Sequence, residues 1–458
     1  MMNLSDYKNI HCIGIGGVGV SAIAEILLSR GYNVSGSDMK QSDLTDRLAA
    51  DGVKVYIGHS AENVEDADLI VYSAAIAEEN PEVIRAREKN IPLASRAEVL
   101  GVLMEDFKNS IAICGTHGKT TTTSMVSLIL DHAKLDPTIL VGGNLAEIGG
   151  NVRVGQSEFF VTEACEYRDS FLELRPRIEV ILNIDSDHLD YFKDIDHIVR
   201  SFDQFAKAVP ADGIIVAYDA NPFVSQVIKD IPGAITFGYN ENCTYHIANV
   251  TFDENGRGSF DMYHEGVSLG KVNLMMPGEH NILNAVAAFA CCHQLGVAPE
   301  VIIETLDKFT GTQRRFDIQG TTASGVKVID DYAHHPTEIK ATLAAAKNIH
   351  HNKLWCLFQP HTYTRTLALF EEFADSFGDA DVLILAEIYA AREKNIYKVS
   401  SKGLAEEVLK KHPDQEVYYM ETFEEMAAYV KEHAGENDLV LTMGAGDIYK
   451  VGQMILED

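Results

Sequence analysis

The sequence lacks the cysteine pairs and the long apolar runs that mark several classes of protein. Its seven cysteines are scattered and form no C-x-x-C pair, which argues against a zinc site or a disulfide framework and for a reducing compartment. No apolar run approaches the roughly 20 residues of a membrane-spanning helix, and the N-terminal residues do not follow a signal-peptide pattern. We therefore expect a cytoplasmic protein without a membrane partner.

Basic residues are also scarce. The chain has 38 Lys and Arg against 68 Asp and Glu, a formal charge of −30 at pH 7. A surface this negative repels nucleic-acid phosphates, so we expect no nucleic-acid partner. It still allows a local basic pocket for an anionic small molecule.

The length of 458 residues exceeds what one hydrophobic core usually organises. Strand-like and helix-like stretches alternate in three series, which predicts an α/β fold with mostly parallel sheets. The expected domains are a Rossmann-like domain (1–107), a central P-loop ATPase-like domain (108–313) and a second Rossmann-like domain (314–458). Strands are expected at 10–15, 32–36, 53–57, 69–72, 111–114, 159–162, 178–184, 327–331, 354–358, 382–386, 417–420 and 439–442. An irregular, antiparallel stretch with a turn at 253–258 is expected before a helix at 280–295.

The first glycine-rich loop follows a strand and opens a helix. Gly14, Gly16 and Gly19 form G-x-G-x-x-G, which allows a tight turn and a close approach of backbone N–H groups to a pyrophosphate. Asp38 ends the next strand region, where an acidic side chain commonly meets a ribose hydroxyl. The motif predicts nucleotide-diphosphate binding, but it does not distinguish NAD from a UDP-sugar.

A second loop, Gly115-Thr116-His117-Gly118-Lys119-Thr120, also joins a strand to a helix. Its N–H groups can cradle a triphosphate, Lys119 adds a positive charge, and the Thr120 hydroxyl can bind Mg²⁺. The loop is shorter than the standard one, because Ile113 stands where a strict motif has glycine. We predict ATP binding. The threonines that follow are expected mainly to start and pack the helix, with Thr121 counted among the nucleotide contacts.

Two more strand ends bear on the same place. Glu163 directly follows the strand expected at 159–162, and His188 comes four residues after the strand expected at 178–184. The carboxyl ends of parallel strands share one edge of a sheet, so both side chains could meet the phosphate loop there. A carboxylate suits Mg²⁺, whereas an imidazole is a poorer ligand.

Several blocks together resemble the Mur ligases over essentially the whole chain. The blocks are HCIGIGGVGVSAIAEIL, SGSD, GTHGKTTTT, EACEYRDSF, NIDSDHLDYF, GEHNILNAVAA, RRFD, DDYAHHPTEI, FQPHTYTRT and GAGDIY. The resemblance is strongest to the alanine-adding branch. It implies an ATP-dependent ligase of peptidoglycan precursor synthesis, which joins L-alanine to the carboxylate of UDP-N-acetylmuramate through an acyl phosphate.

The resemblance also implies residue roles. Lys119, His188 and Arg315 would be catalytic, Thr120 and Glu163 would hold one Mg²⁺, and Glu163 and His188 would hold a second. ATP would contact Gly115, Thr116, His117, Gly118, Lys119, Thr120, Thr121, His280, Asn281, Asn284, Arg315 and Asp331. The other substrates would contact Gly16, Gly17, Gly19, Asp38, His59, Ser73, Tyr332, His334 and Arg365.

Two positions depart from patterns found among the relatives. Some carry arginine after the histidine of the FQPH block, where this chain has Thr362, so the alanine carboxylate is expected to rest on Arg365. Other Mur ligases carry a carbamylated lysine where this chain has Asp203, as the alanine-adding branch does. Lys207 is expected on a solvated helix face.

Alternatives stay open at this stage. A recycling ligase would attach a murein peptide to the same UDP-sugar, and a non-catalytic nucleotide sensor would keep both loops without turnover. A dehydrogenase is disfavoured, because it would leave the second loop without a role. The stretch 389–395 is a candidate for shaping the amino-acid pocket, whose choice among alanine, glycine and serine no motif determines. We expect a monomer or a weak homodimer.

Overall fold

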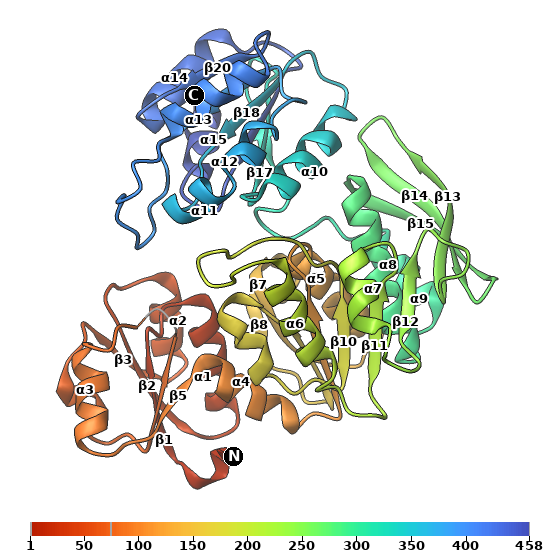
Figure 1. Cartoon of the computed structure of the whole chain (residues 1–458). Helices are drawn as coiled ribbons and strands as arrows, with labels where there is room; N and C mark the ends of the chain where they lie inside the picture. The colour runs from red at the N-terminus through yellow and green to blue at the C-terminus, as the bar shows by residue number, and fades with distance from the viewer. Residues whose placement is uncertain (1, 74–75, 458) are drawn as a thin grey trace.

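The computed structural model describes residues 2–73 and 76–457, and it divides them among three sheets (Figure 1). Each sheet draws its strands from one continuous part of the chain, so the three domains follow one another in sequence order. In Figure 1 the C-terminal domain lies above the other two, with α10 and α11 on its lower side. In the described part of the chain no helix is both long and apolar enough to cross a membrane.

The N-terminal domain is a parallel five-stranded sheet of order β3-β2-β1-β4-β5. Its elements are η1 (Leu4–Asp6), β1 (Asn9–Ile13), α1 (Val18–Ser29), β2 (Asn33–Asp38), α2 (Asp43–Ala50), β3 (Lys54–Ile57), η2 (Ala61–Val64), β4 (Leu69–Tyr72), α3 (Pro81–Glu88), β5 (Leu93–Ser95) and α4 (Arg96–Glu105). Strand order reverses beside β1, which places the glycine loop after β1 at the switch point where such sheets bind ligands.

The central domain is a ten-stranded sheet with β6 (Asn109–Cys114) near its middle. The other strands of its parallel part are β7 (Thr138–Leu145), β9 (Phe159–Glu163), β10 (Ile178–Ile181), β11 (Ile214–Tyr218) and β12 (Ile235–Gly238). The antiparallel strands are β8 (Gly150–Arg153), β14 (Arg257–His264) and β15 (Val267–Pro277). Strand β13 (Tyr245–Phe252) pairs in parallel with β12 and antiparallel with β14, so it joins the two parts. The helices are α5 (Lys119–His132), η3 (Ala146–Ile148), η4 (Tyr167–Glu173), α6 (Ile195–Ala206), α7 (Pro222–Ile228), α8 (Glu279–Gln294) and α9 (Pro299–Leu306).

The C-terminal domain is a six-stranded sheet of order β16-β17-β21-β18-β19-β20, parallel except for β16. Its elements are β16 (Asp317–Thr321), β17 (Lys327–Asp331), α10 (Pro336–Lys347), β18 (Leu354–Phe358), α11 (Tyr363–Ala368), α12 (Phe370–Ala374), β19 (Val382–Leu385), α13 (Ser401–Lys411), β20 (Glu416–Tyr419), α14 (Phe423–His433), β21 (Leu439–Met443) and α15 (Tyr449–Leu456). Every residue of β18, β19 and β21 is buried, as expected for strands covered by helices on both faces.

The first two domains share one apolar core. A continuous cluster runs from Ile10 and Leu27 in the N-terminal domain to Phe171 and Phe202 in the central domain. The backbones also approach closely there, since a Cβ on Gly101 of α4 would lie 2.0 Å from the carbonyl oxygen of Glu173. The C-terminal domain has separate cores, and hydrogen bonds and ion pairs connect it to the central domain.

The structure confirms the expected α/β class and the antiparallel stretch around 253–258. Strand β17 occupies the residues predicted for it, whereas β10 ends at Ile181 rather than at 184. The sequence analysis did not predict β5, β7, β8, β11, β12 or β16, and β11 and β12 pair in parallel, before the antiparallel stretch begins. In β7 the glycines Gly142 and Gly143 interrupt the apolar pattern, and pairing with neighbouring strands compensates. Strand β5 is only three residues long, too short to show a pattern.

One buried carboxyl group lies inside the central sheet. Glu179 of β10 is fully buried, the Cys114 thiol donates to its Oε1 at 3.2 Å, and its Oε2 has no hydrogen-bond partner in the described part of the chain. Burial raises the pKa of Glu179 to about 8. The folded chain therefore binds a proton near neutral pH that the unfolded chain, with an ordinary value of 4.5, has released.

This proton makes stability depend on pH. Between about pH 4.5 and 8 the folded state binds more protons at Glu179, so the free energy of unfolding should fall as the pH rises and level off above about 8. We expect Glu179→Gln to raise the melting temperature at pH 8 and to change it little at pH 5, measured by calorimetry. Exposed Glu304→Gln is the control. Parallel pH profiles for Glu179→Gln and the unmodified chain would refute this account.

Candidate functional site

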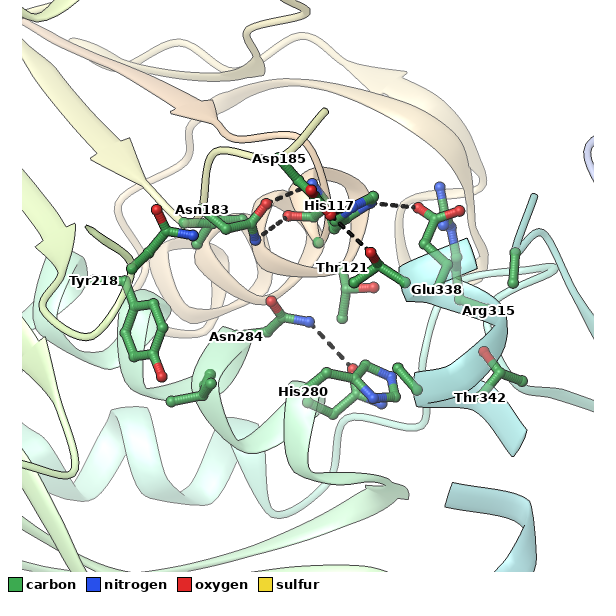
Figure 2. Close-up of a pocket in the computed structure, with 18 of the residues that line it drawn as sticks. His117, Thr121, Asn183, Asp185, Tyr218, His280, Asn284, Arg315, Glu338 and Thr342 are labelled. Carbon is green, nitrogen blue, oxygen red and sulfur yellow. Dashed lines mark hydrogen bonds and ion pairs between the residues drawn. The ribbon is translucent and has the colours of Figure 1, made fainter. Parts of the chain in front are cut away.

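The phosphate loop opens into a cavity of about 440 Å³ between the central and C-terminal domains (Figure 2). Predicted ATP contacts that line this cavity are His117, Gly118, Thr121, His280, Asn281, Asn284, Arg315 and Asp331. Figure 2 shows Asn284 and His280 on α8 facing Thr121 and His117 across the open space. Both domains thus contribute to one pocket, as the sequence analysis required of an ATP site.

The loop itself is held by its neighbours. The His117 N–H donates to Asn183 Oδ1 at 2.8 Å, and the Asn183 amide donates back to the His117 carbonyl at 3.0 Å. Gly118 has a φ of +85°, and a Cβ there would lie 2.4 Å from Asn284 Oδ1. The loop therefore requires glycine at this position and an amide at Asn183, which the sequence analysis did not single out.

Lys119 begins α5 and lies over the loop. Its ammonium donates to the carbonyls of Gly115 and Thr116 and to Glu166 Oε2, the last at 2.8 Å. Burial alone would lower the pKa of Lys119, but Glu166 keeps it above its ordinary value. The other Glu166 oxygen lies 3.8 Å from His188 Nε2, so Glu166 joins two predicted catalytic residues. The sequence analysis missed Glu166, although it lies in the EACEYRDSF block.

The predicted metal ligands Thr120 and Glu163 lie at the ends of adjacent elements. Glu163 pairs with Ile113 of β6, directly before the phosphate loop. Its Oε1 accepts from the Gly142 N–H, and its Oε2 has no hydrogen bond with any described residue. The Thr120 hydroxyl accepts from Arg315 Nη2 at 3.4 Å. A hydroxyl and a carboxylate oxygen are hard donors that suit Mg²⁺, so the chemistry of this pair fits that ion.

Three of the predicted ATP contacts, His280, Asn281 and Asn284, lie at the start of α8. Burial lowers the pKa of His280 to about 4, so this imidazole is neutral at pH 7. Asn281 donates to the Pro277 carbonyl at 2.7 Å and accepts from the Asn284 amide at 3.3 Å. The two asparagines thus bond to the start of their own helix and to each other, and they also line the cavity.

The C-terminal domain contributes Arg315 and Asp331 to the same cavity. The Arg315 guanidinium lies 5.0 Å from the Tyr332 ring centroid and reaches Thr120 of the central domain. Burial raises the pKa of Asp331 to about 6, although its oxygens accept the N–H groups of Phe316 and Ala333. Arg315 is therefore the cation that crosses from the third domain toward the phosphate loop.

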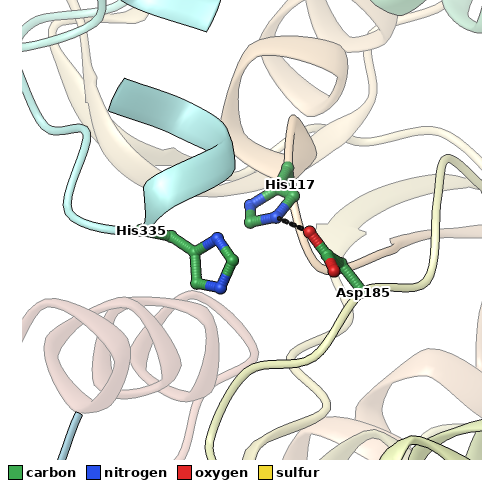
Figure 3. Close-up of side chains that lie close together, drawn as sticks. All are labelled: His117, Asp185 and His335. Carbon is green, nitrogen blue, oxygen red and sulfur yellow. Dashed lines mark hydrogen bonds and ion pairs between the residues drawn. The ribbon is translucent and has the colours of Figure 1, made fainter. Parts of the chain in front are cut away.

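A cluster of His117, Asp185 and His335 places three metal-type ligand atoms within 4.8 Å of one another (Figure 3). Their nitrogens are already used, however. His117 donates to Asp185 and to Glu338, both at 3.1 Å, and His335 bonds the Ser186 carbonyl and the Thr337 N–H. Burial alone would lower the pKa of His117, but the two carboxylates raise it to about 9. The cluster is an ionic link between domains.

A second cavity of about 570 Å³ lies beside the first, again between the central and C-terminal domains. His188 and Arg365 line it, and Arg365 donates from Nε and Nη2 to Asp187 at 3.0 and 3.3 Å. Arg365 Nη1 also donates to the His361 carbonyl at 3.1 Å. Among the described residues, Tyr332 and His334 line neither cavity, although the His334 ring lies 6.0 Å from that of His361.

The N-terminal domain brings its predicted residues to one edge of its sheet. The Gly16 N–H donates to Asp38 Oδ2 at 2.9 Å, and the Ser73 hydroxyl lies near Gly14. His59 bonds Ser37 Oγ at 2.9 Å and buried Glu82 at 3.2 Å. Gly17 caps α1.

One further cation lies at this edge of the N-terminal domain. The Arg96 side chain lies against Gly19 at the start of α1, where a Cβ would lie 2.9 Å from it. The sequence analysis missed Arg96, because no short motif surrounds it.

Family models match three consecutive parts of the chain. The models are described as the Mur ligase family, catalytic domain (residues 9–108), the Mur ligase middle domain (113–292) and the Mur ligase, glutamate ligase domain (314–446).

Individual relatives match over the full length. UDP-N-acetylmuramate–L-alanine ligases from Alkaliphilus metalliredigens and Caldanaerobacter subterraneus are 50% and 51% identical, each covering 100% of this chain and 99% of the relative. The crystal structure of a UDP-N-acetylmuramate-alanine ligase from Thermotoga maritima is 30% identical, with a TM-score of 0.82 over 98% of both chains. A murein peptide ligase from Psychrobacter arcticus, 24% identical with a TM-score of 0.73, shares the fold.

The ionic link predicts a measurable pKa. Glu338→Gln removes one of the two carboxylates that stabilise the His117 imidazolium, so the pKa of His117 should fall from about 9 by about 1 or more. Histidine NMR titration would measure it. Glu300→Gln, exposed and far from the cluster, should leave the value unchanged. An unchanged pKa of His117 in Glu338→Gln would contradict the ionic link.

Proposed function

This chain belongs to the Mur ligase family, and we propose that it joins L-alanine to the carboxylate of UDP-N-acetylmuramate with cleavage of ATP to ADP and phosphate. The observation that carries the proposal is the 50% identity over the whole chain to ligases of that specificity. The geometry supports it, because two cavities lie between the same domains, and Glu166 connects His188 of the second cavity to Lys119 of the phosphate loop, which opens into the first.

The reaction needs an activated acyl group. The γ-phosphoryl group of ATP passes to the substrate carboxylate, giving ADP and an acyl phosphate. The uncharged amine of L-alanine then attacks the carbonyl carbon, the C–O bond to phosphate breaks, and the amine loses its proton. A carboxylate oxygen is a poor leaving group, whereas inorganic phosphate is a good one.

Negative charge gathers on the phosphates during this transfer, and the site supplies cations. Lys119 and Arg315 are proposed to contact phosphate oxygens, with Glu166 holding Lys119 over the loop. We infer that Thr120 and Glu163 hold Mg²⁺, and that His188 with Glu163 holds a second ion. When bound there, Mg²⁺ would neutralise the phosphate oxygens. The adenosine is proposed to lie against His280, Asn281, Asn284 and Asp331.

The UDP-sugar is proposed to bind the N-terminal domain. Its diphosphate would face Gly16, Gly17 and Gly19 at the N-terminus of α1, where free N–H groups favour an anion. Arg96 adds a cation at the same place. Asp38, His59 and Ser73 are proposed to lie toward the uridine. The muramyl carboxylate would then extend from this domain toward Lys119.

The amino acid is proposed to enter the second cavity, next to His188 and Arg365. Tyr332 and His334 are proposed to lie behind the residues that line this cavity. A recycling ligase that accepts a murein peptide remains the second candidate, because a structure of that kind shares the fold. We also propose that the protein works in the cytoplasm, where ATP and UDP-sugars are made, as a monomer or a weak homodimer.

The proposal predicts which mixtures release phosphate. Phosphate release from ATP should require UDP-N-acetylmuramate and L-alanine together, with the murein tripeptide a poor replacement. Lys119→Ala, which loses the cation of the loop, should be inactive. Each substrate is omitted in turn while phosphate is measured. Turnover that ignores L-alanine, or that prefers the tripeptide, would refute the proposed specificity.

The magnesium assignment makes a separate prediction. An amide oxygen binds Mg²⁺ more weakly than a carboxylate, so Glu163→Gln should raise the Mg²⁺ concentration for half-maximal activity by about tenfold or more. Exposed Glu147→Gln, on the neighbouring η3, should behave like the unmodified chain. An unchanged Mg²⁺ dependence in Glu163→Gln would remove Glu163 from the metal site.

A further inference from the structure

We propose that Arg392 binds the carboxylate of the incoming amino acid. The inference rests on the proposed function and goes beyond it, since Arg392 lies outside the motifs of the sequence analysis and only its neighbourhood was considered there. Arg392 lines the second cavity together with Thr362, the residue that replaces an arginine of some relatives. The same cavity is thus lined by the position at which some relatives carry an arginine and by a different arginine, Arg392.

Three arginines line this cavity, and they differ in what they already bind. Arg365 is committed, because each of its three nitrogens donates to Asp187 or to His361. Arg168 lies over the Tyr167 ring, with 5.5 Å between its guanidinium carbon and the ring centroid. In residues 2–73 and 76–457, Arg392 has neither a hydrogen bond nor an ion pair. Arg392 is therefore the arginine with the most binding capacity left.

The carboxylates of the cavity do not compete for Arg392. Asp187 is paired with Arg365, and Asp190 accepts the Tyr167 hydroxyl at 2.9 Å. Glu393 accepts the Thr364 N–H at 2.9 Å and the Thr364 hydroxyl. Each acid next to the cavity already has a donor. An added carboxylate would find the Arg392 guanidinium unneutralised.

The backbone on both sides of Arg392 is fixed against the same segment that carries Thr362. The Tyr389 N–H donates to the Pro360 carbonyl at 2.8 Å, and the Tyr389 and His361 rings stack at 5.5 Å. After Arg392, Glu393 binds Thr364. Arg392 is thus exposed but presented from an anchored loop, which lowers the entropy lost when its guanidinium binds a ligand.

The cavity also orients the amino acid. His188 lines one part of it, 3.8 Å from Glu166, whose other oxygen binds Lys119 of the phosphate loop. An amine directed toward His188 would face the place where the acyl phosphate forms, with the carboxylate directed toward Arg392. A free amino acid carries that charge, whereas the first residue of a peptide has an uncharged amide there. Arg392 therefore favours a single amino acid over a peptide.

The test compares L-alanine with L-alaninamide, which lacks the carboxylate charge. In Arg392→Ala, KM for L-alanine should rise by about tenfold or more, while KM values for ATP and UDP-N-acetylmuramate stay within about twofold. The preference for L-alanine over L-alaninamide in kcat/KM should fall by a similar factor, because L-alaninamide never used the charge. Arg392→Lys should retain part of the preference, and Arg168→Ala should retain all of it.

Placing an arginine at position 362 should rescue the Arg392→Ala variant. Thr362→Arg in the Arg392→Ala background should restore much of the L-alanine preference, since both positions line one cavity. The inference is overturned if Arg392→Ala keeps the full preference, if Arg168→Ala loses it instead, or if KM for the UDP-sugar rises rather than KM for L-alanine. Failure of the proposed function looks different, because the unmodified chain would then release phosphate without regard to L-alanine.

Discussion

The loop after β10 is the constraint on which the arrangement of the site depends. Its carboxylates Asp185 and Asp187 bind partners from the C-terminal domain, Thr337 to the first and Arg365 to the second. Burial would raise the pKa of Asp187, but Arg365 holds it well below its usual range, so the carboxylate stays charged. The same loop reaches the phosphate loop through His117. This short segment therefore connects the phosphate loop, α10 and α11, and its residues line both cavities.

The two domain boundaries are held by different kinds of contact, one mainly by apolar packing and the other by polar contacts. The N-terminal and central domains share one apolar core, which resists rearrangement because opening it would expose buried surface to water. The C-terminal domain is tied by ion pairs and hydrogen bonds, as between His117 and Glu338. Such contacts can be exchanged for water at small net cost. Motion between domains therefore costs the least free energy at the boundary that contains both cavities.

The sequence predicted the parts of the site that depend on local order. The glycine loops, Glu163 and His188 follow strands, and parallel strands end at a common edge, so chain position alone located them. Glu166 and Asn183 stand next to those motifs, but their role depends on which way a side chain turns after the strand. Arg96 and Arg392 are far in sequence from the residues they lie near, and only the packing within each domain brings them close to the glycine loop and to Thr362.

The strongly negative chain is proposed to bind three substrates that each carry an anionic group, and the placement of individual cations explains how it can do so. The net charge of −30 acts through water and salt, which screen it beyond about 10 Å. Lys119, Arg315 and Arg392 are proposed to act on the substrates at contact distance, where screening is weaker. Neighbouring acids do not cancel them uniformly, since Glu166 positions Lys119 while Arg392 has no acidic partner among the described residues. Binding of anionic groups therefore depends on where individual cations lie and how they are held, and the net charge of the chain does not decide it.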